Sequence, residues 1–241
     1  MEETVRLSKE MASRGLCSRR EADRYIEQGW VLVDDEVVDV LGSKVLPSQK
    51  ITLKNQAQKQ QDERKTVILN KPIGYVSNLP EEGYLPATEL ITPENYVGPK
   101  YLSSRISYQG LAPAGRLDID SQGLLILTQD GRVARQLIGE NSTVEKEYLI
   151  WVIGDIDNEA IERLRFGLRL DGQPLKPAKV KKIDDHHMSI TLTQGRKRQI
   201  RRMCDLVDLR VDRLMRIRIG KLRLGKLPPG KWRYLNEDEQ F

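Results

Sequence analysis

The sequence of 241 residues predicts an α+β protein, with a small N-terminal α/β-hairpin module followed by a domain built on a mixed, mostly antiparallel sheet. Two observations support this prediction. Strand-like and helix-like segments follow one another in irregular order, without the repeated βαβ pattern of a doubly wound fold. A polar segment at 54–65 separates about 5–53 from about 66–235, and we expect a linker there because Ala57 is its one apolar side chain.

Two helices and a hairpin are expected in the N-terminal part. A short helix is predicted at 8–14, ended by Gly15. Ser18 and Glu21 form a capping box for a second helix, which Gly29 closes. The apolar runs VLV and VVDV flank the acidic turn DDE and predict the hairpin. The second helix has a basic face, which binding explains better than packing does: Arg19, Arg20 and Arg24.

The larger part alternates strands with a few helices. Strands are predicted at 66–69, 124–128, 146–153 and 188–193, and helices at 158–165 and 198–208. The last helix has a stripe at helical spacing that should be buried: Ile200, Met203, Cys204 and Val207. Its arginines, Arg198, Arg201 and Arg202, lie outside that stripe at the helix start. Arginines at a helix N-terminus have an electrostatic reason only if anions come to it.

Composition limits the class of protein. Residues 196–233 hold fourteen Lys/Arg and three Asp, whereas the whole chain has a net charge of only +5. This local excess favours a polyanion such as nucleic acid over the alternative of a solvated strand face. Apolar runs are too short for a membrane span, and the charged N-terminus lacks a signal-peptide core, so we expect a cytoplasmic protein. Cys17 and Cys204 are expected to be reduced, and adjacent His186 and His187 are poor metal ligands, so no metal is expected.

One short segment combines charge with a buried strand. Residues 114–123 read AGRLDIDSQG, and the apolar run LLILT follows directly. In an extended segment Asp118 and Asp120 would share one face about 7 Å apart, a spacing that two-carboxylate chemistry tolerates. Two aspartates in a loop are, however, more often turn-forming residues. This segment by itself does not decide between the two interpretations.

Several motifs in a fixed order decide it. They are SRREADRYIEQG at 18–29, NKPIG at 70–74, GRLDIDSQGLLILTQDG at 115–131, KEYL at 146–149 and TQGRKRQIRRM at 193–203. Together they resemble the rRNA pseudouridine synthases of the RsuA/RluF type, which join an S4 RNA-binding module to a catalytic domain. The resemblance covers about residues 5–235. It implies the isomerisation of uridine to pseudouridine, which needs no cofactor because no atom is gained.

The resemblance also implies roles for individual residues. Asp118 matches the essential aspartate, which acts as a nucleophile or as a base on a ribose proton. Arg116 is expected to enter the space left by the extruded base, with a salt bridge as the alternative. Tyr148 would stack on the uracil, unless it is a core tyrosine. Arg201 matches the residue that pairs with the aspartate and opposes its protonation once it is desolvated. Asp120 is interpreted as support for the loop.

Further residues are assigned to RNA or to the pocket. Ile200 matches the aliphatic residue beside the base. Asn70 and Lys71 would support the pocket or an RNA phosphate, with a structural role at the strand end as the alternative. RNA contacts are also expected from the basic side chains Arg198, Arg202, Arg19, Arg20 and Arg24.

The expected substrate is ribosomal RNA, in particular that of the large subunit, free or in a subunit or assembly intermediate, and we expect a monomer. Transfer RNA is the alternative substrate, and a non-catalytic ribosome-associated binder is the alternative class of protein. Two features depart from the family pattern. The stretch at 79–114 is longer than usual, and Asp34-Asp35 stands where S4 modules commonly have Asn-Gly.

Overall fold

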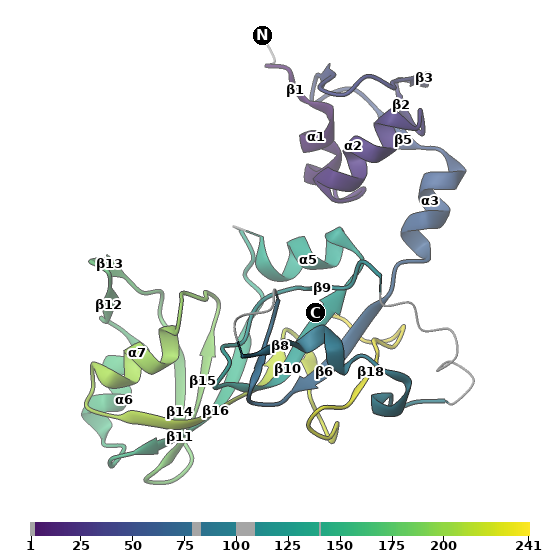
Figure 1. Cartoon of the computed structure of the whole chain (residues 1–241). Coiled ribbons are helices and arrows are strands. Elements are labelled where there is room, and N and C mark those ends of the chain that lie inside the picture. The colour runs from purple at the N-terminus through teal and green to yellow at the C-terminus, as the bar shows by residue number, and fades with distance from the viewer. Residues whose placement is uncertain (1–2, 79–82, 100–108, 140) are drawn as a thin grey trace.

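A computed structural model describes residues 3–78, 83–99, 109–139 and 141–241. Figure 1 shows a small N-terminal module joined by helix α3 to a larger domain built around a sheet. The architecture is the α+β arrangement predicted from the sequence. Within the described ranges, every helix is too short or too polar to cross a membrane.

The N-terminal module packs its two helices against short strands. The helices are α1 (Leu7–Ser13) and α2 (Arg19–Glu27), and the strands are β1 (Val5–Arg6), β2 (Val31–Val33), β3 (Glu36–Val37), β4 (Lys44–Val45) and β5 (Ile51–Leu53). The predicted capping box forms, since Glu21 N–H donates to Ser18 Oγ and Ser18 N–H donates to the Glu21 carboxylate. One small core holds the apolar side chains, among them Leu7, Met11, Tyr25, Ile26 and Val31.

The predicted hairpin has an unusual turn. Asp34 and Asp35 both have positive φ, 49° and 68°, in the left-handed region that Asn-Gly turns normally use. The Asp34 carboxylate accepts hydrogen bonds from Gln49 Nε2 at 2.8 Å and from Lys50 N–H at 2.9 Å, and these bonds lower its pKa. These bonds offset the strain, so the departure from Asn-Gly does not change the hairpin.

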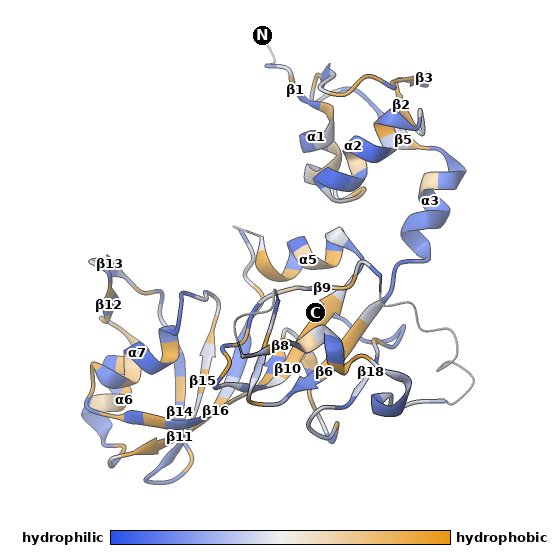
Figure 2. Cartoon of the chain, viewed as in Figure 1, coloured by the Kyte–Doolittle hydropathy of each residue, from blue (hydrophilic) through white to orange (hydrophobic). Residues whose placement is uncertain are grey.

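The connecting segment is a helix, where the sequence was interpreted as a linker without periodicity. Helix α3 (Asn55–Asp62) appears almost wholly hydrophilic in Figure 2. Only Ala57 and Gln61 are buried on it. Gln61 Nε2 donates to Glu21 Oε1 at 3.0 Å and to the Tyr25 hydroxyl at 2.6 Å. A hydropathy pattern cannot find a helix whose buried face includes an amide that pairs with polar groups of another element.

The larger domain is built on a mixed sheet in the order β14-β15-β11-β16-β10-β6-β18. Its strands are β6 (Thr66–Lys71), β10 (Gln122–Thr128), β11 (Lys146–Ile153), β14 (Lys179–Lys182), β15 (His187–Leu192), β16 (Arg210–Ile219) and β18 (Trp232–Tyr234). Short strands accompany it: β7 (Tyr75–Val76), β8 (Leu85–Pro86), β9 (Ala112–Pro113), β12 (Arg169–Leu170), β13 (Gln173–Pro174) and β17 (Leu222–Arg223). Along the main order only the β10–β16 pair is parallel.

The centre of this sheet is buried on both faces. Leu124 and Ile126 of β10 pack into one apolar cluster, and Leu125 and Leu127 pack into another on the opposite face. This explains why LLILT is a continuous apolar run and does not alternate. Figure 2 shows β6 and β10 as the most hydrophobic part of the chain.

Three helices cover the sheet: α5 (Gly131–Ile138), α6 (Asn158–Arg165) and α7 (Gln199–Asp205). Two single-turn 3₁₀ helices, η1 (Ala87–Leu90) and η2 (Pro93–Asn95), lie in the long segment between β7 and β9, parts of which (79–82 and 100–108) are outside the described residues. The predicted stripe of the last helix is buried: Ile200, Met203, Cys204 and Val207. Cys17 and Cys204 are unpaired and buried, and burial raises the pKa of each thiol to about 12.

Besides α3, several other elements were not predicted. Helix α5 was missed, and so was β16, a central strand. Its sequence, RVDRLMRIRI, interleaves charged and apolar residues, and residues 196–233 were instead interpreted as a basic surface. Arg216 of this strand is only 3% exposed. Net charge in a window does not reveal which arginine points inward.

We expect Gln61→Ala to lower the free energy of unfolding by about 1–3 kcal/mol, because it removes the donor to the buried Tyr25 hydroxyl and one of the two cationic or amide partners of Glu21 Oε1, leaving Arg64 as the other. Chemical denaturation measures this. Gln56→Ala, an exposed site on the same helix, is the matched control and should change stability by less than about 0.5 kcal/mol. Equal effects of the two substitutions would contradict the role assigned to Gln61.

Candidate active site

The segment 116–120 connects β9 to β10, and its backbone carbonyls are held one by one. Arg216 Nη1 donates to Arg116 O, Ser77 Oγ to Leu117 O, Ser121 N–H to Asp118 O, Gly74 N–H to Ile119 O, and Arg201 Nη2 to Asp120 O. The donor–acceptor distances lie between 2.6 and 3.1 Å. Residues 116–120 belong to no strand or helix, so these bonds replace the ladder that regular structure would supply.

Donors from distant parts of the chain meet at this segment. Gly74 is the last residue of the NKPIG motif and Ser77 follows it, Arg201 comes from α7, and Arg216 comes from β16. Gly123, at the start of β10, lies so close to β16 that a Cβ there would be 2.3 Å from the Arg216 carbonyl oxygen. Only glycine fits at that position, which is the physical reason for the glycine between the acidic segment and LLILT.

Asp120 is the more strongly paired of the two aspartates. Arg198 binds its carboxylate with two nitrogens, at 3.1 and 2.9 Å, and Arg201 Nε lies 3.2 Å from Oδ2. Partial burial raises the pKa of Asp120, but the hydrogen bond from Arg198 and the charges of Arg201 and Arg198 outweigh it and hold the pKa below its ordinary value. The anion that meets the arginine-rich start of α7 is therefore a carboxylate of this chain.

Asp118 is freer than predicted. Its nearest cation is the Arg198 guanidinium, whose Nη1 is 4.0 Å from Oδ2, and 39% of its side chain is exposed. The expected direct pair with Arg201 is wrong: no ion pair within 4.0 Å joins them in the described part of the chain. Arg201 also donates to Val211 O and to Asp120 O, which directs its guanidinium to Asp120. A sequence cannot tell which of two aspartates two positions apart receives an arginine.

Two buried cations lie under the segment. Lys71 is fully buried, and its Nζ donates to Pro72 O at 2.9 Å and to Tyr75 O at 2.8 Å. Burial lowers the pKa of this lysine to about 8, although the charges of Asp118 and Asp120 oppose the shift. Arg216 donates from Nε to Leu124 O at 2.7 Å. Sequence analysis missed Arg216, and its position between inward-facing apolar residues of a strand was the available signal.

The side chains of Asn70 and Lys71 are both buried. Asn70 is 2% exposed, and its Nδ2 donates to Leu227 O at 2.7 Å. These contacts fit the alternative of a structural role at the end of β6, and they do not favour the predicted contact with an RNA phosphate. The predicted support of the pocket stays a prediction. Both polar heads are occupied by backbone carbonyls.

Tyr148 and Ile200 lie on β11 and α7, and Arg116 belongs to the segment itself. Tyr148 is partly buried in β11, opposite Arg216, and packs against the apolar clusters on both sides of the domain. Ile200 is 5% exposed on the buried stripe of α7. The Arg116 side chain is exposed, whereas its carbonyl is held by Arg216. Tyr148 is thus in the same apolar cluster as Leu117 of the segment, and Ile200 is on the helix whose Arg201 donates to Asp120 O.

The remaining predicted RNA contacts are spread over both parts of the chain. Arg19 and Arg20 are exposed at the start of α2. Arg24 lies over the Tyr25 ring and donates to Gln60 of α3. Arg202 pairs with Asp171, at 3.0 and 2.6 Å, so its guanidinium is already occupied. Arg19 and Arg20 are thus the least engaged of the set.

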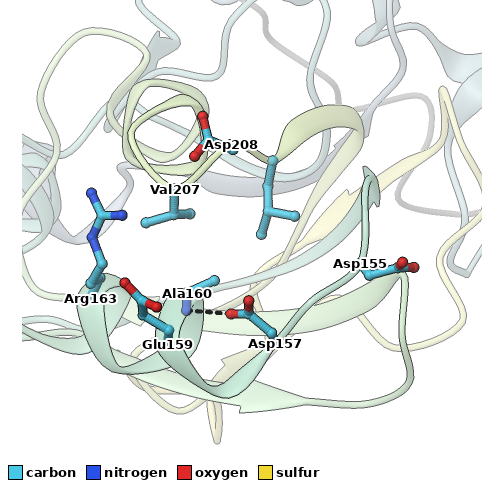
Figure 3. A pocket seen from close by; sticks show the side chains of 8 residues that line it. Asp155, Asp157, Glu159, Ala160, Arg163, Val207 and Asp208 are labelled. Atoms are coloured by element: carbon cyan, nitrogen blue, oxygen red, sulfur yellow. Dashed lines mark hydrogen bonds between the residues drawn. The ribbon is translucent and has the colours of Figure 1, made fainter.

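A separate hollow of about 220 Å³ lies at the start of α6 (Figure 3). Its lining is acidic, with Asp155, Asp157, Glu159 and Asp208. The Asp157 carboxylate accepts from Ala160 N–H at 2.7 Å and caps the helix. An acidic hollow repels phosphates, so it is not part of an RNA site.

Comparison with known proteins shows which class of protein this chain resembles in sequence and fold. Residues 65–206 match the RNA pseudouridylate synthase family, and residues 5–51 match the S4 domain. The dual-specificity RNA pseudouridine synthase RluF of Escherichia coli K12 is 38% identical over 98% of this chain and 77% of its own length. An uncharacterized RNA pseudouridine synthase of Aquifex aeolicus is 35% identical over 98% of this chain and 92% of its own. A crystal structure of a pseudouridylate synthase, 26% identical, matches 96% of both chains with a TM-score of 0.63.

The chain therefore belongs to the RNA pseudouridylate synthase family. More narrowly, it is a pseudouridine synthase of the RsuA/RluF type that carries an N-terminal S4 RNA-binding domain.

The buried Lys71 amine predicts a pH effect. Its pKa is about 8 in the folded protein and has the ordinary value of 10.5 in the unfolded chain, so between these pH values the unfolded chain binds more protons and folding stability rises with pH. Relative to Lys71→Met, the wild type should gain about 1–2 kcal/mol of unfolding free energy between pH 8 and 10.5. Urea denaturation at several pH values measures the difference.

Lys226→Met removes an exposed amine and controls for the loss of one charge. A constant difference between wild type and Lys71→Met across this pH range would contradict the assignment.

Proposed function

We propose that this enzyme converts uridine to pseudouridine in ribosomal RNA, in particular that of the large subunit, with Asp118 as the essential carboxylate. The observation that carries the proposal is the exposed Asp118 carboxylate on a backbone whose carbonyls are all held from 116 to 120. A fixed backbone with an open side chain positions a reactive group and leaves it accessible to a substrate.

The reaction breaks the bond between base N1 and ribose C1′ and forms one between base C5 and C1′. The proton of C5 is lost and N1 gains one, so the product is an isomer of the substrate. Asp118 acts either as a nucleophile or as the base that removes a ribose proton. Both roles require an accessible carboxylate, and 39% of the Asp118 side chain is exposed.

The uridine must leave its stack to reach Asp118, at a cost of a few kcal/mol. In our proposal the exposed Arg116 side chain fills the vacated space. Tyr148 stacks on the extruded uracil, and Ile200 packs beside it. Arg201 contributes through Asp120, because its guanidinium binds that carboxylate and its carbonyl.

The two parts of the chain divide the work. We propose that residues 5–53 bind RNA phosphates through the exposed Arg19 and Arg20, that 66–235 carry the chemistry, and that 54–65 connect them. Arg24, Arg198 and Arg202 would turn from their present partners toward phosphates when RNA is bound. A monomer in the cytoplasm is part of this proposal, because the enzyme docks onto a much larger particle.

Transfer RNA is the alternative substrate. The E. coli relatives are named dual-specificity RNA pseudouridine synthases, which favours testing more than one class of RNA. Pseudouridines should be mapped in total RNA from cells that lack this protein and from cells in which it is restored. Loss and recovery of a site in large-subunit ribosomal RNA is the expected result, whereas changes confined to transfer RNA would contradict the ribosomal assignment.

Asp118→Asn should abolish pseudouridine formation, by at least about 1,000-fold in kcat, because an amide is neither a nucleophile nor a base at this position. RNA affinity should stay within about threefold, since the phosphate contacts are unchanged. Single-turnover kinetics and filter binding measure the two quantities. Asp238→Asn, an exposed site near the C-terminus, is the control. Turnover at the wild-type rate by Asp118→Asn would exclude the proposed mechanism.

A further inference from the structure

The Ser77 hydroxyl makes two hydrogen bonds to one residue of the acidic segment. Ser77 is 3% exposed, and its Oγ donates to Leu117 O at 2.6 Å and accepts from Leu117 N–H at 2.8 Å. It comes from the loop that follows β7, 40 positions earlier in the chain. A buried hydroxyl that both donates and accepts has nearly all of its hydrogen-bonding capacity in use.

These two bonds fix the peptide units on both sides of Leu117. The N–H belongs to the unit that joins 116 to 117, and the carbonyl belongs to the unit that leads directly into Asp118. Peptide units are planar, so holding the carbonyl also holds the amide nitrogen of Asp118. The direction in which the Asp118 side chain leaves the backbone is thereby set.

Arg216 Nη1 also holds the unit that joins 116 to 117, because it donates to Arg116 O at 3.1 Å, whereas the unit that leads into Asp118 is held at its carbonyl by Ser77. Leu117 is 6% exposed and packs into the apolar cluster around β6 and β10. Apolar packing is not directional, so it does not determine how the adjoining peptide is rotated. Without Ser77 the segment would keep its depth in the core and the bond from Arg216 to Arg116 O, but it would lose the bond to the Leu117 carbonyl, which belongs to the peptide that leads into Asp118.

We propose that Ser77 is a positioning residue, which acts on the reaction by orienting the Leu117 peptide and hence Asp118. This inference rests on the proposed role of Asp118. The hydroxyl itself makes no hydrogen bond to the Asp118 carboxylate among the contacts of the described residues. Its effect should therefore appear in the rate of the chemical step and not in RNA binding.

The test compares Ser77→Ala with wild type in single-turnover and steady-state kinetics on the RNA that the wild-type enzyme modifies. We expect kcat to fall roughly 10- to 100-fold, because small misplacements of a reacting group have effects of this size, with KM within twofold. Ser77→Cys keeps a weak donor and acceptor and should restore part of the lost rate.

Ser142→Ala is the matched control. The Ser142 hydroxyl also donates to backbone carbonyls, those of Gln136 and Leu137, and lies 3.4 Å from Val144 N–H, but at the far end of α5. Its loss should affect thermal stability and leave kcat within twofold. Hydrogen exchange should accelerate at the Leu117 amide in Ser77→Ala and not in Ser142→Ala.

Four results would overturn the proposal. For Ser77→Ala they are a kcat within twofold of wild type while the Leu117 amide exchanges faster, an unchanged exchange rate of the Leu117 amide, and a rise in KM with kcat unchanged. The fourth is a loss of kcat in Ser142→Ala equal to that in Ser77→Ala. An active Asp118→Asn enzyme in the same assay would instead remove the proposed role of the aspartate. The two failures are therefore distinguishable.

Discussion

Hydrogen bonding to the backbone of residues 116–120 is the constraint on which the rest of the site depends. This segment crosses between strands without a ladder of its own, and every carbonyl in it accepts a hydrogen bond: that of Asp118 from the nearby Ser121 N–H, and the others from distant parts of the chain. Unpaired carbonyls at this depth would each cost a few kcal/mol. The donors come from the NKPIG loop, α7 and β16, so the motifs that are separate in sequence act as one structure around Asp118.

Charge is distributed around the segment with a clear division of roles. Asp120 takes the two closest guanidinium groups, from Arg198 and Arg201, and thereby holds the start of α7 against the loop. Asp118 remains more open, with a cation at 4.0 Å. Lys71 and Arg216 lie beneath both, so a carboxylate covered by a bound base would still be near positive charge. Pairing one aspartate tightly leaves the other free to react.

The sheet provides the rigid support. Strand β10 is buried on both faces, and the acidic segment runs directly into it, so Asp118 stands close to the least mobile part of the domain. The S4 module reaches this domain through α3, whose Gln61 binds Glu21 and Tyr25 of the module. Support and RNA capture are thus separate parts of the chain linked by a short polar helix.

Local patterns were sufficient for the α+β class, the capped helix α2, the buried run LLILT and the stripe of α7, because each depends on neighbouring residues and a fixed period. The candidate Asp118 came instead from the family resemblance that several separate motifs carry together. Tertiary structure alone decided the partner of Arg201, the burial of Lys71 and Asn70, the inward direction of Arg216 and the helical form of 54–65. Each of these features depends on a polar side chain whose partner lies on another element; for 54–65 that side chain is Gln61. Periodicity carries no information about such pairs, since a hydrogen bond across tens of residues depends on the final packing of the strands.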